Sequence, residues 1–503
     1  MEVFVQKVCL LCFLVVPLHP IFNKTFLVMN KKLLISAAAL IVSTSTFAGG
    51  ILTNTNQNAS YLRNPARDAV IAIDGVYSNP AGIAFLPEGF HFSLSWQAAW
   101  QKREITSTFP YYPANENSLG VQTKEFIGKA TAPVIPSFQA AYVFNDKWSV
   151  SAQFAIGGGG GKCEFENGLP MFEKMVGAEI MGTGLATTYG LTQNLTGEQY
   201  FYGLQVGGTY KVTDNVSVFG GVRGVLANCS YTGAIQNIKV NGMDAAQYSA
   251  AATMAQQGAE QALAAGMMDK YQELMIQAGT ASAVANKIKD DYILDCSQNG
   301  FGITPIVGVD VNLGNLNLAA KYEFRTKINL ENESKNTPNV DALMPAYADK
   351  AEVRSDIPSL LTLGAQYSFS SVRIGAGFHY YWDKDAQGSP IKEGDNTWEA
   401  LLGVEWDMNE KVTLSCGGYR TQYGFDDADM NDTNFNISSY GLCLGGAYKI
   451  NDMLKVNVGY MHSFYDEHEV PMYSEVNGST MQIGSDLYTR KNDVVGVSLD
   501  FKF

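Results

Sequence analysis

Residues 316–328 have the sequence LNLAAKYEFRTKI, in which apolar and polar side chains alternate. Because successive side chains of a β-strand point to opposite faces, this order gives a strand one apolar face and one mostly charged face. Such a strand fits either a soluble β-sandwich or a barrel in a membrane. The apolar face is predicted to carry Leu316, Leu318, Ala320, Tyr322, Phe324 and Ile328, and the polar face Asn317, Ala319, Lys321, Glu323, Arg325 and Lys327.

The same alternation recurs elsewhere in the chain. Residues 148–156 and 216–226 again place large apolar side chains on one face and Ser, Gln, Gly or Arg on the other. Recurrence over a chain of this length favours a barrel with lipid outside and a polar lumen over a sandwich.

Short polar turns separate the alternating runs into six hairpins. The runs are about ten residues or longer, which is the length that a tilted strand needs to cross a bilayer. Six hairpins give twelve strands, and one more strand at residues 90–105 and another at 494–503 give fourteen. The sequence therefore predicts an all-β, 14-stranded antiparallel transmembrane β-barrel. The turns lie at Asn145-Asp146, Asp214-Asn215, Gly314-Asn315, Ser370-Ser371, Asn409-Glu410 and Asn451-Asp452.

The last strand supports this prediction. Residues 494–503 alternate up to a terminal Phe503. This ending resembles the terminal strand by which outer-membrane barrels are recognised for insertion.

Composition excludes several other classes. With 46% hydrophobic and 17% charged residues, the chain has too much apolar material for a disordered protein. Its mean hydropathy of -0.06 excludes a bundle of transmembrane helices, and its pI of about 4.9 argues against a nucleic-acid partner. The 49 Gly, 26 Phe, 26 Tyr and 6 Trp suit many strands, tight turns and an aromatic girdle.

The N-terminus has the features of a secretory signal. From Met29 the chain shows two lysines, an apolar stretch at residues 33–42 and small residues up to Ala48, where cleavage is expected. Residues 1–28 are then either a functional extension or sequence upstream of the true start at Met29. We expect residues 1–48 to be a leader, 49–88 a separate N-terminal segment and 89–503 the barrel.

Seven long connections are expected outside the cell. The third, residues 231–299, contains an Ala- and Met-rich part without proline, which predicts a helical extracellular insertion. Its methionines either offer an adaptable apolar docking surface or only pack the helices together.

The mature chain would keep five cysteines, which show no metal-binding spacing. Cys229 and Cys296 flank the third connection at matching distances from the adjoining strands. The two either form a disulfide across the loop mouth or are, like the others, unrelated small apolar residues. No metal site and no cofactor are predicted.

The segment at residues 49–88 is too rich in turns to be a bilayer strand, so it must lie inside the lumen or at the periplasmic end. Within it, residues 67–86 read RDAVIAIDGVYSNPAGIAFL and include Asn79, Pro80, Ala81 and Gly82. This stretch resembles the plug signature of the FadL-type outer-membrane long-chain fatty-acid and hydrophobic-compound transporters. We call residues 49–88 the hatch.

The resemblance implies passive transport across the bacterial outer membrane. In such proteins a hydrophobic ligand lands on a groove between the third and fourth outer loops, here 231–299 and 331–356, and then enters the lumen. It leaves sideways into outer-membrane lipid near the third strand. That strand runs here into five glycines, of which Gly157, Gly158 and Gly159 are the candidates for the opening, although a flexible loop start is the alternative.

The ligand would be a long-chain fatty acid or an aromatic hydrocarbon, and the sequence does not choose between them. Strand parity places Arg223 and Lys321 in the lumen, either as contacts of a ligand head group or as part of an ordinary charge network. We expect a monomer and no enzyme, because none of the histidines stands in a catalytic motif. The alternative function is a general porin or an adhesin-type barrel.

Overall fold

The computed structural model describes residues 51–113, 122–182, 184, 186–476 and 479–503. The predicted leader at residues 1–48, with Met29 and Ala48, lies outside the described residues. Among the described residues, no helix is both long and apolar enough to cross a membrane.

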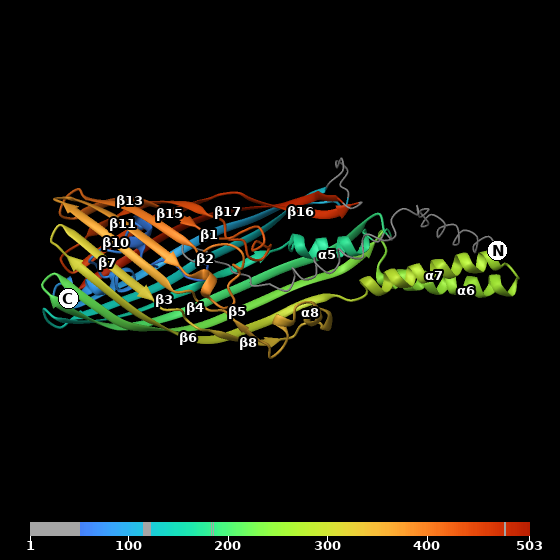
Figure 1. The fold of residues 1–503 in the computed structure, drawn as a ribbon, viewed down its shortest axis with the longest axis horizontal. Helices are drawn as coiled ribbons and strands as arrows, with labels where there is room; N and C mark the ends of the chain where they lie inside the picture. The colour runs from blue at the N-terminus through green and yellow to red at the C-terminus, as the bar shows by residue number, and fades with distance from the viewer. Residues whose placement is uncertain (1–50, 114–121, 183, 185, 477–478) are drawn as a thin grey trace.

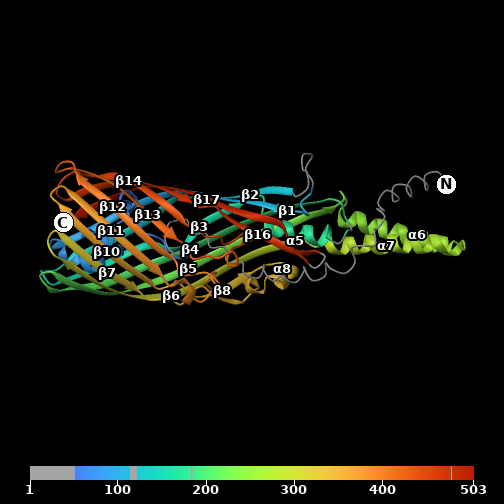
Figure 2. The same ribbon diagram turned by 45° about the horizontal axis from the view of Figure 1, so that its top comes forward.

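Fourteen antiparallel strands form a closed barrel, and pairing of β1 with β17 closes it (Figures 1 and 2). The predicted strand number is therefore confirmed. The strands of the wall are β1 (Gly89–Phe109), β2 (Gln122–Val143), β3 (Trp148–Phe165), β4 (Tyr189–Thr213), β5 (Val216–Val240), β6 (Tyr292–Asn312), β7 (Leu316–Glu323), β10 (Leu360–Phe369), β11 (Val372–Tyr381), β12 (Trp398–Asp407), β13 (Val412–Gln422), β14 (Ser439–Lys449), β15 (Leu454–Tyr465) and β17 (Ser479–Lys502).

Three further strands extend the wall at the end opposite the short turns. β8 (Asn329–Ser334) pairs with β6 beyond the end of β7, β9 (Glu352–Arg354) pairs with β8, and β16 (His468–Val476) pairs with β17. The helices are α3 (Ala59–Arg63), α4 (Gly75–Ser78), α5 (Pro170–Ile180), α6 (Ala245–Ala264), α7 (Met268–Ile288), α8 (Pro338–Leu343), and the 3-10 segments η2 (Pro80–Phe85), η3 (Pro345–Tyr347) and η4 (Asp383–Asp385).

All six predicted hairpin turns are present between strands of the wall. Local chemistry explains three of them, because the side chains of Asn145, Asn409 and Asn451 accept hydrogen bonds from backbone N–H groups two and three residues ahead. These turns and the C-terminus gather at one end of the barrel (Figure 1).

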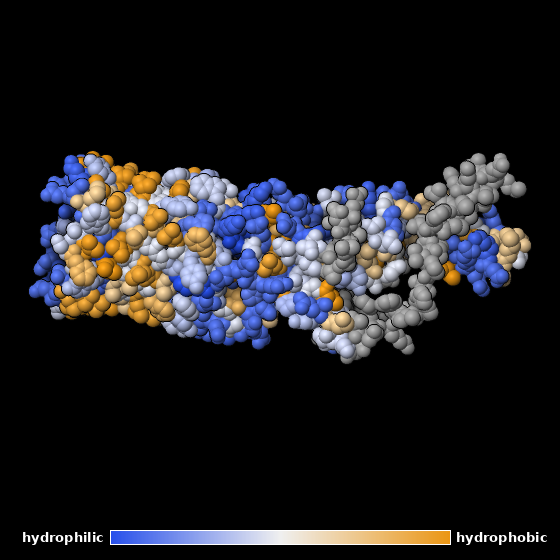
Figure 3. Space-filling model, turned by 90° about the horizontal axis from the view of Figure 1, so that it is seen from above, coloured by the Kyte–Doolittle hydropathy of each residue, from blue (hydrophilic) through white to orange (hydrophobic). Residues whose placement is uncertain are grey.

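Around this end runs an apolar belt, to which every strand of the wall contributes an exposed large apolar side chain. Figure 3 shows these hydrophobic residues over the half of the barrel that carries the short turns, and hydrophilic residues beyond it. A belt around the whole wall is what a membrane-spanning barrel requires. Its members include Leu94, Phe138, Val150, Leu204, Val222, Val307, Leu318, Leu363, Ile374, Leu402, Leu414, Leu442, Val458 and Leu499.

Beyond the belt, the two faces of the wall exchange their polarity. On β5 the outward side chain changes from Leu226 to Asn228, while the inward one changes from Arg223 to Cys229 and Tyr231. The inward residues there join the largest buried apolar cluster. The protein therefore has a polar lumen at the level of the belt and an apolar chamber between the belt and the barrel end opposite the short turns.

This exchange corrects the predicted limits of the outer loops. Residues 231–240 and 292–299 belong to β5 and β6, so the third connection is shorter than residues 231–299. The alternation predicted from residue 316 also fails after Phe324, because β7 ends at Glu323. Ile328 is consequently fully buried, instead of facing outward with Leu318.

The helical insertion consists of α6 and α7, which project from the far end of the barrel (Figures 1 and 2). A capping box between Asp244 and Gln247 starts α6. The buried positions of both helices are mostly alanines, whereas Met254, Met268 and Met275 are exposed. Alanines rather than these methionines therefore pack the two helices together.

Candidate functional site

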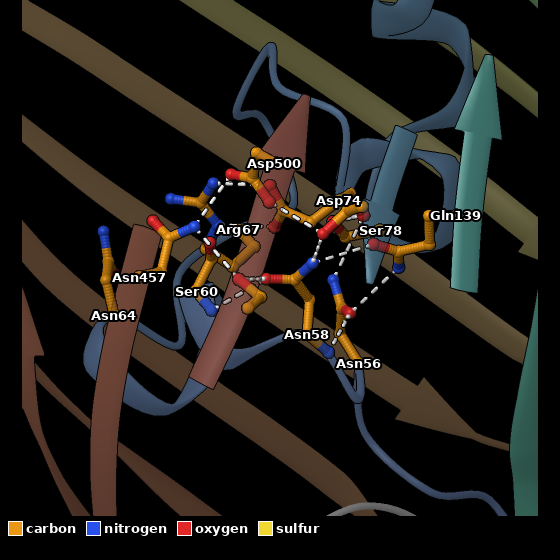
Figure 4. Close-up of polar contacts among 12 residues, drawn as sticks. Asn56, Asn58, Ser60, Asn64, Arg67, Asp74, Ser78, Gln139, Asn457 and Asp500 are labelled. Atoms are coloured by element: carbon orange, nitrogen blue, oxygen red, sulfur yellow. Dashed lines mark hydrogen bonds and ion pairs between the residues drawn. The ribbon is translucent and has the colours of Figure 1, made fainter. Parts of the chain in front are cut away.

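The described part of the hatch lies inside the lumen, and its attachment to the wall begins at Asn58. The Asn58 amide donates to Ser93 Oγ on β1 at 2.8 Å and to Gln139 Oε1 on β2 at 3.0 Å. Its oxygen accepts hydrogen bonds from Ser498 Oγ on β17 at 3.0 Å and from the Ser60 N–H at 2.9 Å. Both amide protons and both lone pairs are used, so this single side chain joins the hatch to three strands (Figure 4).

A buried ion-pair network holds the next part of the hatch. Arg67 donates to both oxygens of Asp74 at 2.7 and 2.8 Å, and to Glu405 on β12 at 3.1 Å. Arg63 donates to the same Glu405 oxygen at 2.6 Å. Each buried guanidinium thus has a carboxylate partner, which such a charge needs in a low-dielectric interior.

Asn79 of the predicted hatch motif has two roles. Its side-chain oxygen caps η2 by accepting the Gly82 N–H at 3.2 Å, and its amide donates to Asp310 on β6 at 2.5 Å. The carbonyls of Pro80 and Ala81 accept hydrogen bonds from Thr209 and Ser217 on the wall. The motif is therefore an anchor of the hatch to β4, β5 and β6.

Gly82 completes the motif by its lack of a side chain. A Cβ atom at Gly82 would lie 2.4 Å from the amide nitrogen of Asn79, so any larger residue would displace the side chain that caps η2.

Arg223 and Lys321 face the lumen, as the alternation of side chains along their strands predicts. Both bind Glu323, at 2.6 and 2.7 Å, and Lys321 also donates to the Tyr77 carbonyl of the hatch at 2.8 Å. These contacts form a charge network between wall and hatch. A contact of either cation with a ligand head group stays a prediction.

A small cavity lies beside the hatch. A cavity between the hatch and β10–β11, lined among others by Tyr77 and His379, has a volume of about 10 Å³. That is space for roughly one water molecule.

Strand pairing in the wall is interrupted at the glycines of residues 157–161, in the middle of β3. β2 and β3 pair up to Phe138 and Phe154, and pairing resumes only at Ala130 and Cys163. Register shifts between β3 and β4 also fall at Gly158, and Gly159 has a φ of 78°. The backbones of β2 and β3 are therefore not paired beside Gly157, Gly158 and Gly159, the glycines proposed from the sequence as the lateral opening.

The start of the hatch covers this interruption. Thr53 forms a β-bridge with Gly158, and the Asn54 N–H donates to the Gly157 carbonyl at 3.1 Å. Gln57 accepts the Ile156 N–H at 3.0 Å. A Cβ atom on Gly158 would lie 2.3 Å from the Leu52 carbonyl oxygen, so this close approach requires glycine. We call residues 52–57 the strap.

The apolar chamber contains a cavity of about 480 Å³, which we call the outer cavity. Its wall combines α5, α8, the outer ends of β5, β6, β16 and β17, and the connection between β13 and β14. Most of its lining is flexible and apolar, including Met171, Met175, Leu343, Met344, Met430 and Met472. Such a surface adapts to ligands of different shapes.

One side of the outer cavity is charged. Lys174 of α5 forms a buried ion pair with Asp486 of β17, and Asp432 accepts the hydroxyl of Tyr488 at 2.9 Å. Burial and the neighbouring Asp486 raise the pKa of Asp432 to about 6. Two carboxylates therefore share one lysine there.

Neither this cluster nor Asn58 was predicted from the sequence. Residues 174, 432 and 486 lie in three distant parts of the chain, two of them in segments expected to be loops, and no motif marks them. Lys174 itself stands between Glu173 and Met175, so its charge gave no local signal of a buried site.

Of the two alternatives for Cys229 and Cys296, the structure has the one without a disulfide. Cys229 and Cys296 are both free and buried. In the register of β5 and β6, Cys229 lies opposite Gln298 and Cys296 opposite Tyr231, so the two cysteines are diagonal neighbours. Diagonal positions are roughly 7–8 Å apart, beyond the usual reach of a disulfide.

No protein-family profile and no curated protein sequence matches the chain. Solved structures share its fold. A Pseudomonas aeruginosa FadL homologue is 13% identical, with a TM-score of 0.61, over 90% of this chain and 100% of that one. The P. putida toluene transporter TodX is 15% identical, with a TM-score of 0.51, over 86% and 95%. The FadL-type resemblance expected from the hatch is thereby confirmed for the fold.

Proposed function

We propose that the chain, which has the FadL-type fold, passes hydrophobic small molecules passively across the bacterial outer membrane. The observation that supports this proposal is that the inward face of the wall changes from polar at the hatch to apolar at the outer end of the barrel. The apolar part encloses a chamber with a cavity of about 480 Å³. An apolar molecule that enters such a cavity gains about 25 cal/mol per Å² of surface removed from water. Long-chain fatty acids and aromatic hydrocarbons both meet this requirement. The role is transport and not catalysis.

The proposed exit is lateral, between β2 and β3. The missing pairs between these strands, the glycines at 157–159 and the strap over them support this route. A molecule leaving there would enter the lipid of the outer membrane directly. Movement of the strap is then the step that opens the path.

A general porin needs a water-filled lumen. Here the hatch occupies the lumen and is hydrogen-bonded to the wall, which argues against a porin. We also propose that the protein is a monomer, because every strand of the wall contributes to the apolar belt and no side lacks a lipid-facing surface.

A binding titration tests the proposal. Oleate and toluene are titrated side by side into the purified full chain in lipid nanodiscs, and binding is followed by the intrinsic fluorescence of its aromatic residues. Ala178 lines the outer cavity, so Ala178→Phe fills part of it. Ala264→Phe makes the same change at an exposed position of the helical insertion and serves as the control.

We expect saturable binding of at least one ligand, weakened about tenfold or more by Ala178→Phe and unchanged by Ala264→Phe. Absence of saturable binding of both ligands, together with steady open channels in bilayer recordings, would contradict the proposal in favour of a porin.

A further inference from the structure

Three lysines lie side by side on the outside of the wall, where the barrel closes. Lys491 of β17 is the register partner of Lys102 of β1, which is in turn the register partner of Lys129 of β2. The residues before and after each lysine are buried on the inward face, so all three side chains point outward. Lys129 and Lys491 are exposed, and Lys102 is half-buried. We call these three residues the lysine row.

Two carboxylates flank the lysine row on β1 and β3, and only one of them binds a member of it. Lys102 Nζ donates to Glu104 at 2.6 Å. Glu164 of β3 is the register partner of Lys129, but its carboxylate binds Lys162 at 2.6 Å. Lys129 itself forms no ion pair within the parts of the chain that the structure describes.

Lys491 is also without an ion pair there. Asp493, the next outward residue of β17, is turned away from the lysine row toward β15. Its carboxylate accepts the Tyr460 hydroxyl at 2.6 Å and lies 2.7 Å from His462 Nδ1. Two of the three ammonium groups thus have no carboxylate partner among the described residues, in a chain whose net charge is -14.

This arrangement has an electrostatic cost. Side chains directly opposite each other in an antiparallel pair have Cβ atoms about 5 Å apart, and like charges at such positions destabilise the sheet. The two contacts in the row, Lys491 with Lys102 and Lys102 with Lys129, are both of this kind. An anion bound across the three strands would offset this repulsion.

The lysine row lies at the border of the apolar belt, on the side of the outer loops. Trp100, which is 46% exposed, is the last belt residue of β1 and directly precedes Lys102 on the outward face. Phe464 of β15 is opposite Lys491 and is 55% exposed. Tryptophans at such a border lie among lipid head groups, and a lysine there extends its ammonium group to them while its stem covers apolar surface. The row is therefore at the level of the head groups.

Another part of the same border is uncharged. On β4, β5 and β6 the outward residues next to the belt are also register partners, and they are Tyr200, Asn228 and Asn299. The side-chain amide of Asn228 donates to that of Asn299 at 2.9 Å. The unpaired cations are thus a feature of β17 and β2 beside β1, and not of the border in general.

We propose that the lysine row binds the phosphate group of an anionic lipid in the leaflet that surrounds this border of the belt. Phosphate oxygens accept charge-assisted hydrogen bonds from ammonium groups. The acyl chains of the same lipid would lie against Trp100 and the belt below it, whereas a dissolved phosphate ion would lack this second contact. The site lies on the outside of the barrel, so the inference goes beyond the proposed transport and does not depend on it.

Trp100 provides an optical test. Phosphatidic acid and phosphatidylcholine with brominated acyl chains, which quench tryptophan fluorescence on contact, are added in turn to nanodiscs that hold the full chain in unlabelled phosphatidylcholine. The signal of the site is the difference between the unmodified chain and a Trp100→Phe variant in the same lipids. The amount of each brominated lipid that quenches half of this signal gives its relative affinity.

We expect phosphatidic acid to bind about tenfold more tightly than phosphatidylcholine, because basic side chains near a membrane surface attract anionic head groups. Lys129→Gln with Lys491→Gln, which keeps the pair of Lys102 and Glu104, should reduce this preference to less than about threefold. Lys147→Gln with Lys411→Gln is the matched control, because it removes the same charge from two exposed positions in the short turns at the other end of the barrel. The control should keep the full preference.

Equal quenching by the two lipids in the unmodified chain, or equal losses of preference in the two double variants, would overturn the proposal. If inorganic phosphate added at constant ionic strength abolishes the preference, the row binds dissolved phosphate and the lipid assignment is wrong. Should the double variant not fold, the unmodified chain still decides the matter. Its preference for phosphatidic acid must weaken as sodium chloride rises, and a preference that is independent of salt would overturn the role of the lysines. None of these measurements uses a transported ligand, so each outcome leaves the proposed transport untouched.

Discussion

The amide of Asn79 donates a hydrogen bond to the Asp310 carboxylate at 2.5 Å and thereby ties the hatch to β6. Asp310 is fully buried, and it also accepts a hydrogen bond from the side-chain amide of Asn317 on β7 at 2.8 Å. One hydrogen bond thus connects the end of the hatch to the wall near the short turn between β6 and β7.

Replacing Asn79 by Ala should loosen the hatch. The change leaves Asp310 with one donor fewer and η2 without its cap, which together should lower the free energy of unfolding by about 2–4 kcal/mol. Urea unfolding in lipid vesicles measures the loss, and bilayer recordings should show transient openings. Asn64→Ala is the matched control. Residues 64–66 of the hatch are a second Asn-Pro-Ala sequence, and Asn64 forms its hydrogen bonds with Ser60 and Ala66 of the hatch itself. Equal effects of the two changes would argue against an anchoring role of the motif.

A methyl group at position 158 should displace the strap. In Gly158→Ala the new Cβ would meet the Leu52 carbonyl at 2.3 Å, whereas in Gly220→Ala it meets no atom within 4 Å. We expect Gly158→Ala to lower stability by about 1–3 kcal/mol and to expose residues 52–57 to hydrogen exchange. Unchanged protection of the strap would contradict the close approach.

Titration of Asp432 should make stability depend on pH. Its folded-state pKa of about 6 lies above the usual 3.8, so the folded protein binds a proton that the unfolded chain releases in this interval. Stability should therefore fall as pH rises from about 4 to 6, by at most about 3 kcal/mol, and then level off. Asp432→Asn should remove this part of the slope, while Asp427→Asn, an exposed carboxylate in the same connection, should not. A slope that survives in Asp432→Asn would contradict the assignment.

Much of the barrel could be predicted because its signals are local. Asn145, Asn409 and Asn451 form their turns with backbone groups two and three residues ahead, and the belt repeats every second residue. The outer halves of β5 and β6 were mistaken for loops, because their inward face is apolar and their outward face polar, the reverse of the membrane pattern. The outer cavity brings together Lys174, Asp432 and Asp486, which no sequence spacing connects.

Thiol labelling tests whether Cys229 and Cys296 are free, as in the structure. Of the five described cysteines, Cys416 is exposed and the other four are buried. Cys416 lies two residues from the belt residue Leu414 on the outward face of β13, so a small apolar alkylating reagent that enters lipid should modify Cys416 alone in the folded protein, and all five after unfolding without a reductant. If Cys229 and Cys296 react only after reduction, the two are bridged and the free-thiol assignment is wrong.

The central claim, lateral passage of hydrophobic molecules, is tested most directly by locking the strap. Asn54→Cys with Gly157→Cys, in a Cys416→Ser background, places two thiols where the Asn54 N–H meets the Gly157 carbonyl at 3.1 Å. Uptake of radiolabelled palmitate is measured in bacterial cells that lack their own transporter, before and after adding a reductant. We expect the oxidised variant to take up no more than cells without the protein, and the reduced variant to match the Cys416→Ser chain. Equal uptake in the oxidised and reduced states would contradict exit past the strap, and no uptake by the unmodified chain would contradict transport itself.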